Sequence, residues 1–438
     1  MSNKYFICLP AQAHKQLNEY NFRSEQFQEF CQLESNQKQP SPIDKDSNYL
    51  HLAKQFGFQW QPLADKGHVL YDWKAQLMMN ICQSYARKLN HDLSFPVYEV
   101  SGSNMYSQSH PVVDSYAKLY GERLYKNSQS KSDLVMSYDS SYPHFSLASQ
   151  HIKKYSQLPL GFFSMQDCYR YEQSGECMLM FRQRRFYMND IHPFFKDIDQ
   201  AFDHIPEMAD KILQAAKLVN VKYHIVIEVP SEQIFRKHLS QIQKVVDYLG
   251  KPVLINILND NKSRYWIFNM DFKFIDKLGQ SREVACIQID VGNSQVLNIS
   301  YKDKNNQKQH PSIIHSAIPG GVERFLYMIF DDFKNRCPLD FHPIQVRLIP
   351  ISAKHLQVAK RLQSEFSSQL RIDIDDREIN LNLKIKRAHK ELVPNKILIG
   401  DKESESQLRQ HLNSIKSNLQ KIPNLELKVP ILLSQRLI

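Results

Sequence analysis

Two neighbouring segments carry arginines, carboxylates and a histidine at spacings that suit a negatively charged substrate. Residues 168–176 (CYRYEQSGE) contain Arg170 and Glu172, and residues 181–192 read FRQRRFYMNDIH. Side chains on a β-strand alternate between two faces. One face of the second segment would therefore carry Arg182, Arg184, Phe186, Met188, Asp190 and His192. Burying such charges is costly unless they are compensated, so we predict that this face lines a polar cleft.

The alternative for this segment is a solvated strand surface with ion pairs, which explains many charge runs. A second patch favours the cleft. Residues 320–330 begin with two glycines and continue as an amphipathic helix with Arg324 in its first turn, beside a close backbone approach that only glycine permits. Together the two patches therefore predict a functional cleft rather than a solvated strand surface.

Composition narrows the kinds of ligand and partner. The chain has 438 residues and only 12 glycines, and it contains neither the G-x-G-x-x-G nor the P-loop pattern, so a nucleotide must be bound in another way. A net charge of +10 favours a polyanionic partner. No apolar stretch approaches the roughly 18 residues that cross a bilayer. The seven scattered cysteines indicate reduced thiols, so we expect a cytoplasmic protein that does not enter a membrane.

The elements that must hold these side chains can be read from hydrophobic spacing. Apolar residues recur at helical intervals over residues 71–89, and residues 97–100 read as a short strand. A long mixed region follows. Beyond it the pattern becomes a regular βαβαβ order, with strands at 344–350, 370–374 and 396–399 and helices at 353–365, 379–390 and 404–419. This order predicts a small parallel sheet with covering helices.

We therefore predict an α+β protein with three parts. Residues 1–48 are rich in Gln, Asn and Ser and form a small appendage and linker. Residues 49–338 form one large α+β domain that carries the arginine segments. Residues 339–438 form the small α/β domain.

These segments resemble the class II aminoacyl-tRNA synthetases, and most closely the archaeal type of threonyl enzyme. The three class motifs are similar to residues 95–100 (FPVYEV) after the long helix, to residues 169–176 joined to 182–186, and to residues 320–324 (GGVER). The threonyl resemblance is carried by residues 158–160, 190–192, 274–279, 287–291 and 310–315. Residues 346–351, 371–377 and 393–403 resemble the family's anticodon-binding domain.

The resemblance implies a catalytic antiparallel sheet with flanking helices, followed by a small α/β anticodon-binding domain. It also implies a two-step reaction. The carboxylate of an amino acid attacks the α-phosphate of ATP, and the aminoacyl group then moves to the 3′ end of a tRNA. The matching residues imply that Arg170 holds the α-phosphate and the carboxylate, that Glu172 holds the adenine amino group, and that Arg324 meets the γ-phosphate.

The same matches imply further roles. Phe186 would stack under the adenine, and Arg182 and Gln288 would contact the nucleotide. Asp190 and Ser141 fall at amino-acid-binding positions, and Arg377 is a candidate tRNA contact. Mg²⁺ is the expected counterion of ATP. A homodimer is expected, because in this class the helix before the first motif forms the dimer interface.

Threonyl enzymes hold a Zn²⁺ with one Cys and two His, and the metal takes the amino and hydroxyl groups of threonine, which excludes valine. His192 and His315 match the two His positions, whereas the Cys position falls on Ser141. A serine hydroxyl is a poor zinc ligand because it stays protonated near neutral pH. We expect substoichiometric zinc unless His144 completes the set.

The leading hypothesis is a catalytic-only threonine–tRNA ligase. Archaeal-type enzymes carry an N-terminal editing domain, and about 48 residues are too few to form one. Serine lacks one methyl group of threonine, which gives only about 1–3 kcal/mol of discrimination between them. We therefore expect a separate editing protein. Ser141 motivates the alternative of a paralogue that activates another amino acid or charges another acceptor. The third hypothesis, a non-catalytic tRNA-binding regulator, has no need of an ATP site.

Overall fold

The computed structural model describes the chain except for residues 1–2, 40–48, 128–132, 260–263, 421 and 437–438. The chain divides into two compact units. The first comprises residues 1–48, 60–69 and 86–331, and the second comprises residues 49–59, 70–85 and 332–438. Within the described ranges, no helix has both the length and the apolar character needed to cross a bilayer.

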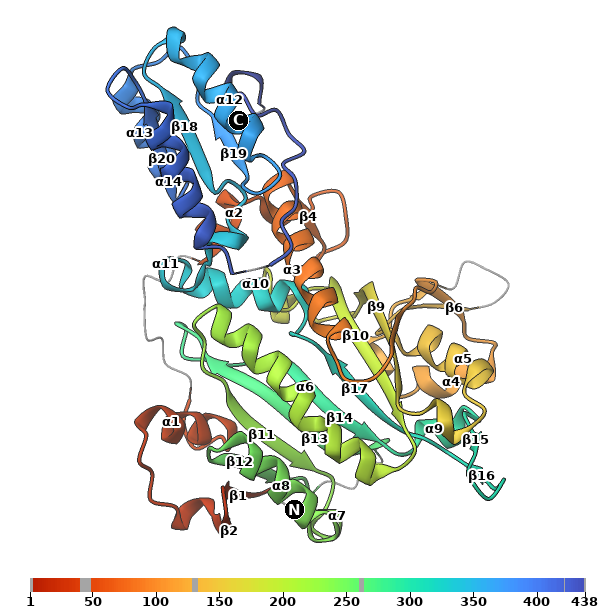
Figure 1. Ribbon diagram of the computed structural model, residues 1–438. Helices are drawn as coiled ribbons and strands as arrows, with labels where there is room; N and C mark the ends of the chain where they lie inside the picture. The colour runs from red at the N-terminus through yellow and green to blue at the C-terminus, as the bar shows by residue number, and fades with distance from the viewer. Residues whose placement is uncertain (1–2, 40–48, 128–132, 260–263, 421, 437–438) are drawn as a thin grey trace. The chain divides into compact units, whose positions relative to one another are not determined.

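A ten-stranded sheet is the framework of the first unit (Figure 1). In spatial order its strands are β2 (Gln12–Gln16), β1 (Lys4–Leu9), β12 (Val253–Ile257), β11 (His224–Val229), β13 (Trp266–Ile275), β14 (Ser281–Asp290), β17 (Ser312–Ala317), β10 (Arg185–Phe195), β9 (Leu160–Tyr169) and β5 (Val97–Glu99). Only the pairs β11–β12 and β5–β9 are parallel. The predicted α+β class with an antiparallel catalytic sheet is confirmed.

Helices and short strands surround this sheet. Figure 1 shows α6 (Ile198–Leu218) and α8 (Leu239–Leu249) across one face, and α10 (Val322–Asp331) packs against β10. The other elements of the first unit are α1 (Glu25–Glu34), β6 (Met105–Ser107), α4 (Pro111–Ala117), β7 (Lys126–Asn127), β8 (Leu134–Met136), α5 (Ser141–His151), α7 (Glu232–Lys237), α9 (Asn293–Val296), β15 (Tyr301–Lys302) and β16 (Lys308–Gln309). The second unit contains α2 (Tyr49–Gln55), most of β3 (Phe58–Trp60), most of β4 (Val69–Tyr71), most of α3 (Trp73–His91), and α11 (Phe333–Arg336).

The sequence of α6 explains its place on the sheet. The Asp197 carboxylate caps the helix by accepting from the backbone N–H of Gln200 at 2.8 Å. Ile205, Met208 and Ile212 are fully buried at helical spacing and form the apolar stripe that such a helix turns inward. Contacts of α6 with β10, β14 and β17 hold the three strands that carry most of the site described below.

The N-terminal segment differs from the predicted appendage. β1 pairs antiparallel with β12 and so extends the catalytic sheet. Ile7, Phe27 and Phe30 pack with Val226 and Leu254 of the sheet in one apolar cluster. The Gln-rich composition concealed these elements, because β1 is only six residues long and α1 offers few apolar positions. The linker predicted up to residue 48 falls partly on residues outside the described ranges.

Other predicted elements lie close to their expected positions. The helix expected over residues 71–89 is α3, and the strand expected at residues 97–100 is β5. The predicted amphipathic helix after the paired glycines is α10, and its apolar residues Phe325, Leu326, Ile329 and Phe330 are all buried. The helical spacing of apolar residues therefore predicted the positions of α3 and α10.

The C-terminal part of the second unit has the predicted βαβαβ order. β18 (Val346–Pro350) lies between β19 (Ile372–Ile374) and β20 (Asn395–Ile399), and both pairings are parallel. The helices are α12 (Leu356–Phe366), α13 (Leu381–Lys390) and α14 (Glu405–Ser417). Ser404 and Gln407 form a capping box at the start of α14. The predicted small parallel α/β domain is confirmed.

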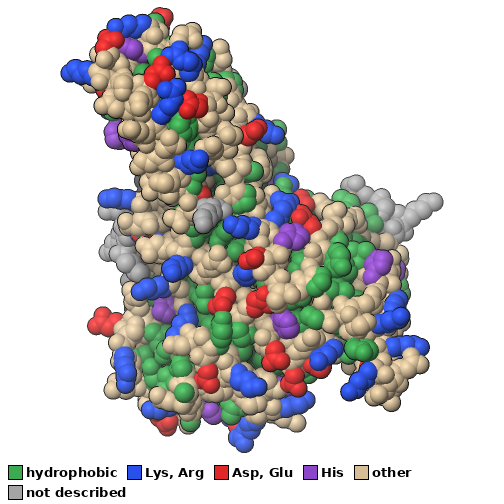
Figure 2. Space-filling view, viewed as in Figure 1, with side chains coloured by type: hydrophobic (Ala, Val, Ile, Leu, Met, Phe, Trp, Pro, Cys, Tyr) green, Lys and Arg blue, Asp and Glu red, His purple; other side chains and the backbone are tan. Residues whose placement is uncertain are grey.

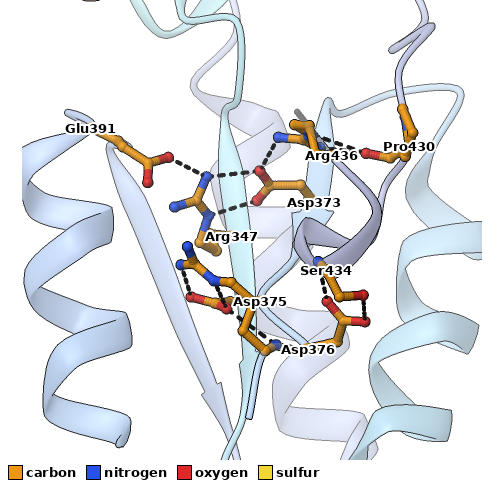
Figure 3. Close-up of polar contacts among 9 residues, drawn as sticks. Arg347, Asp373, Asp375, Asp376, Glu391, Pro430, Ser434 and Arg436 are labelled. Carbon is orange, nitrogen blue, oxygen red and sulfur yellow. Dashed lines mark hydrogen bonds and ion pairs between the residues drawn. The ribbon is translucent and has the colours of Figure 1, made fainter. Parts of the chain in front are cut away.

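A network of ion pairs ties the last residues of the chain to this small sheet (Figure 3). Arg347 on β18 is 1% exposed, and its guanidinium donates to both carboxylate oxygens of Asp373 at 2.9 and 2.8 Å and also pairs with Glu391 at 2.8 Å. Arg436 donates to the same Asp373 carboxylate at 2.8 Å. A buried charge is tolerated when it is paired and hydrogen-bonded, so this network accounts for the arginine inside the domain.

Candidate active site

A cavity of about 220 Å³ is lined by residues of β10, β14 and β17, the segment after β9 and the first turn of α10. Ten residues singled out in the sequence line it: Arg170, Glu172, Arg182, Phe186, Met188, Asp190, His192, Gln288, His315 and Arg324. Ser141 is not among the described residues that line the cavity, and Arg377 lies in the second unit. Residues far apart in the sequence thus meet in one polar cavity.

Arg170 follows β9 directly. Its guanidinium carbon lies 4.3 Å from the ring centroid of Tyr138 and 5.0 Å from that of Phe186. Burial alone would lower the pKa of Arg170, but Tyr138, Cys168 and Asp139 raise it above its usual value. The side chain therefore stays cationic inside the cavity, held by aromatic faces rather than by a carboxylate pair.

Glu172 has an unsatisfied buried oxygen. The residue is 5% exposed, and its Oε2 has no hydrogen-bond partner among the described residues. The nearest cation is the Arg123 Nη2, at 4.0 Å. A buried carboxylate oxygen without a partner costs free energy, and a ligand N–H would remove that cost. This geometry fits a donor such as an adenine amino group.

Arg324, in the first turn of α10, also lines the cavity. Its Nη1 donates to the Glu283 backbone carbonyl at 3.2 Å and lies 3.3 Å from the Glu283 carboxylate, while its guanidinium lies 4.9 Å from the Phe181 ring. Gly320, with φ of +135°, makes the close approach possible, because a Cβ there would lie 2.6 Å from the Val284 carbonyl oxygen. The predicted need for glycine beside Arg324 is confirmed at Gly320.

Arg182 and Gln288 also line the cavity, and both have partners. Arg182 pairs weakly with Glu176, with 3.5 Å between Nη1 and Oε1. The Gln288 Oε1 accepts from the Tyr265 hydroxyl at 3.2 Å. Their predicted contacts with the nucleotide remain predictions.

Arg184 was placed on the cavity face by strand alternation, and the structure contradicts this. β10 begins at Arg185, so the alternation along the strand does not extend back to Arg184. The Arg184 side chain is 5% exposed, pairs with the Asp65 carboxylate at 2.8 Å and stacks on the Tyr171 ring at 4.3 Å. Arg184 therefore fixes the loop before β10 and does not line the site.

Asp190 lies deeper in the cavity and accepts from the backbone N–H of Ser140 at 3.0 Å. Burial, together with the nearby Asp139 carboxylate, raises the pKa of Asp190 to about 7. The two neighbouring carboxylates repel each other when both are ionised. A bound cation would relieve this repulsion. An amino-acid ammonium group is such a cation.

Three buried histidines contact one another beside the cavity, and two of them, His192 and His315, line it. The His192 Nδ1 lies 2.6 Å from the His144 Nδ1, and the His192 Nε2 lies 2.9 Å from the His315 Nδ1. The His315 Nε2 lies 2.8 Å from an Asp290 oxygen. Burial lowers the pKa of His144 to about 3 and that of His192 well below its usual range. Burial would also lower the pKa of His315, but Asp290 outweighs this effect and raises it.

The zinc implied by the family resemblance does not fit these residues. Among the described residues, no three His, Cys, Asp or Glu side chains are grouped so that they could hold a metal. His192 offers opposite ring nitrogens to His144 and His315, so one ion cannot lie about 2.0–2.1 Å from all three rings. The backbone N–H of Ser141, at the first position of α5, donates to Asp139 at 2.9 Å, and its side chain supplies no thiolate.

Several cavity residues carried no clear signal in the sequence. Tyr120, Tyr138, Asp139, Tyr265 and Glu283 all line the cavity. The Tyr120 and Tyr138 rings stack at 3.6 Å, and the Tyr120 hydroxyl donates to Asp139 at 2.5 Å. The available signal is the single carboxylate of Asp139 in the polar run of residues 138–141 (YDSS), at the start of α5, since loops beside regular elements often carry binding residues.

Comparison with known proteins agrees with this arrangement. Residues 125–333 match the tRNA synthetase class II core domain (G, H, P, S and T), and residues 345–416 match the anticodon binding domain. The chain is 39% identical over 356 residues to a threonine–tRNA ligase of Nanoarchaeum equitans, covering 80% of this chain and 56% of that protein. It is 35% identical to the Pyrobaculum aerophilum threonine–tRNA ligase (89% of this chain, 68% of that protein) and 32% identical to that of Pyrobaculum islandicum (99% and 74%).

Solved structures support the fold. A structure described as the RNA binding domain of threonyl-tRNA synthetase from Cryptosporidium parvum matches with a TM-score of 0.75 at 17% identity, over 84% of this chain and 98% of that one. A Giardia lamblia prolyl-tRNA synthetase matches with a TM-score of 0.63 at 14% identity, over 85% and 72%. The sequence relatives decide the family: the chain belongs to the class II aminoacyl-tRNA synthetases, in the threonine–tRNA ligase family.

Proposed function

We propose that this protein is a threonine–tRNA ligase that forms threonyl-adenylate from ATP and passes the threonyl group to the 3′ end of a tRNA. The observation that carries the proposal is the cavity in which Arg170, Glu172 and Arg324 meet Asp190. ATP and an amino acid together require a hydrogen-bond acceptor for the adenine, cations for the phosphates and an anion for the ammonium group. These four side chains supply such groups.

In this proposal the ends of ATP are held by different elements. The unsatisfied Glu172 oxygen accepts from the adenine amino group, and the Phe186 ring packs against the base. Arg170 holds the α-phosphate and the attacking carboxylate, and Arg324 holds the γ-phosphate, with Arg182 beside the polyphosphate. Placing both reactants in one cavity lowers the barrier by orientation. The guanidinium groups stabilise the charge that develops on the phosphate.

Mg²⁺ would enter this site on the triphosphate. The Glu283 carboxylate lines the cavity beside Arg324 and is an oxygen ligand of the kind that Mg²⁺ takes. The bound cation would neutralise phosphate charge during pyrophosphate release. Asp190 would receive the amino group of threonine.

The second half of the reaction needs a tRNA, which we propose is bound through the α/β domain. Lys386, Arg387 and Lys390 are exposed on α13, and Figure 2 shows Lys and Arg side chains over the visible face of this domain. Arg377, the predicted contact, forms a bidentate pair with Asp375 at 2.7 and 2.6 Å, so a tRNA would have to compete with that pair. We also propose a homodimer, on the family resemblance of the helix α3.

The proposal is tested by threonine charging of a total tRNA preparation. We expect threonyl-tRNA to form and tRNA affinity to fall steeply with salt, since each phosphate contact contributes a slope of about −0.7 to −0.9 in log–log form. Replacing Lys386, Arg387 and Lys390 by Glu should raise the KM for tRNA and leave threonine activation intact. The control replaces Lys237 and Lys244, which are exposed on the first unit, by Glu. Equal loss of tRNA affinity in both variants would contradict the role of α13.

A further inference from the structure

An unbroken row of hydrogen bonds between buried side chains reaches the cavity at His192 and His315, which line it. It runs from Ser164 through His144, His192 and His315 to Asp290, and we call it the histidine chain. Its four links measure 2.8, 2.6, 2.9 and 2.8 Å in that order. None of the five residues is more than 8% exposed.

Both ends of the histidine chain accept hydrogen bonds. The Ser164 hydroxyl donates its single proton to the Val100 carbonyl at 2.7 Å, so toward His144 it can only accept. The Asp290 carboxylate accepts from the backbone N–H groups of Gly292 and Asn293 at 2.8 and 2.9 Å and from the Asn293 side-chain amide at 2.7 Å. The His315 ring occupies a further position on this carboxylate, at 2.8 Å.

We infer that the histidine chain replaces the family's zinc, so that the amino-acid pocket works without a metal. The inference rests on the proposed function and concerns how the same site recognises its amino-acid substrate. A zinc ion would need imidazole lone pairs, and every ring nitrogen of the histidine chain is already in a hydrogen bond.

This arrangement has a consequence for substrate choice. With no metal and no imidazole nitrogen left to bind it, the hydroxyl of threonine lacks a strong dedicated partner in this part of the pocket. Sites built to bond a substrate hydroxyl reject the analogue without it by about 10⁴–10⁵-fold, whereas pockets without such a partner discriminate by about 10²-fold. The protein should therefore take small β-substituted amino acids, with threonine preferred over valine by no more than about 10²-fold.

The first test measures metal content, and it does not depend on activity. We expect the full-length protein, purified with zinc in all buffers and then dialysed, to contain far less than one zinc per chain. One tight zinc per chain would overturn the inference.

The second test measures pyrophosphate exchange with threonine and valine, with and without a strong zinc chelator. We expect no loss of rate with the chelator and a ratio of kcat/KM values below about 10². Loss of exchange on chelation, or a ratio near 10⁴, would overturn the inference. If neither amino acid supports exchange while the zinc content is as expected, the proposed function fails and the metal-free site stands.

Discussion

Replacing Arg324 by Ala should lower amino-acid-dependent pyrophosphate exchange by at least about 100-fold, the usual loss when one preorganised charge donor is removed. Arg324 is held at the start of α10 by Phe181 and Glu283, with Gly320 allowing the close approach. Its guanidinium is therefore fixed before ATP binds, and removing it leaves the terminal phosphates without that charge. Arg324→Lys should recover only part of the rate, since an ammonium group lacks the paired N–H donors of a planar guanidinium.

The matched control for this prediction is Arg236→Ala. Arg236 lies on α7, its side chain is 76% exposed, and it pairs with Glu232 four residues earlier, a surface contact that contributes little to stability. We expect this variant to exchange pyrophosphate at the rate of the parent. If Arg324→Ala is as active as the control, Arg324 does not bind the triphosphate.

Replacing Asp190 by Asn should raise the KM for the amino acid by at least about 30-fold, because truncating one partner of a buried charge pair costs about 2–5 kcal/mol. The Asn side chain still has an oxygen that can accept from the Ser140 N–H, as Asp190 does, so the local backbone is preserved. The negative charge that receives the ammonium group is lost. The KM for ATP should change little.

Asp114→Asn is the control for Asp190→Asn. Asp114 lies on α4, and its side chain is 37% exposed and pairs with Lys118. Steady-state exchange with varied threonine and varied ATP distinguishes the two substrates. A similar rise in both KM values for Asp190→Asn would indicate a general loss of structure, and an unchanged KM for threonine would show that Asp190 does not bind the amino group.

Much of the site could be predicted because strand alternation is a regular property of the backbone. Phe186, Asp190 and His192 are two or four residues apart on β10 and all line the cavity. The prediction was wrong for Arg184, because the alternating pattern does not show at which residue a strand begins. Arg184 lies just before β10. Its backbone N–H donates to the Gly67 carbonyl, and its side chain pairs with Asp65.

Other features depend on contacts that a single sequence does not display. The apolar residues of β1 and α1 are few and lie among glutamines, so their packing on β11 and β12 becomes visible only in the folded unit. Asp139 lies in a short loop, and its place beside Asp190 depends on how α5 meets the sheet. The histidine chain likewise joins α5, β10 and β17, three elements whose order in space the sequence alone did not show.

The most direct test of the proposed function is amino-acid-dependent ATP–pyrophosphate exchange measured separately with each of the twenty amino acids. The proposed site predicts that threonine gives the highest kcat/KM, followed by serine and valine, because Asp190 binds the ammonium group of each and the pocket admits a small β-substituent. A different amino acid with the highest kcat/KM, or no exchange with any of the twenty, would contradict the assignment of this protein as a threonine-activating enzyme.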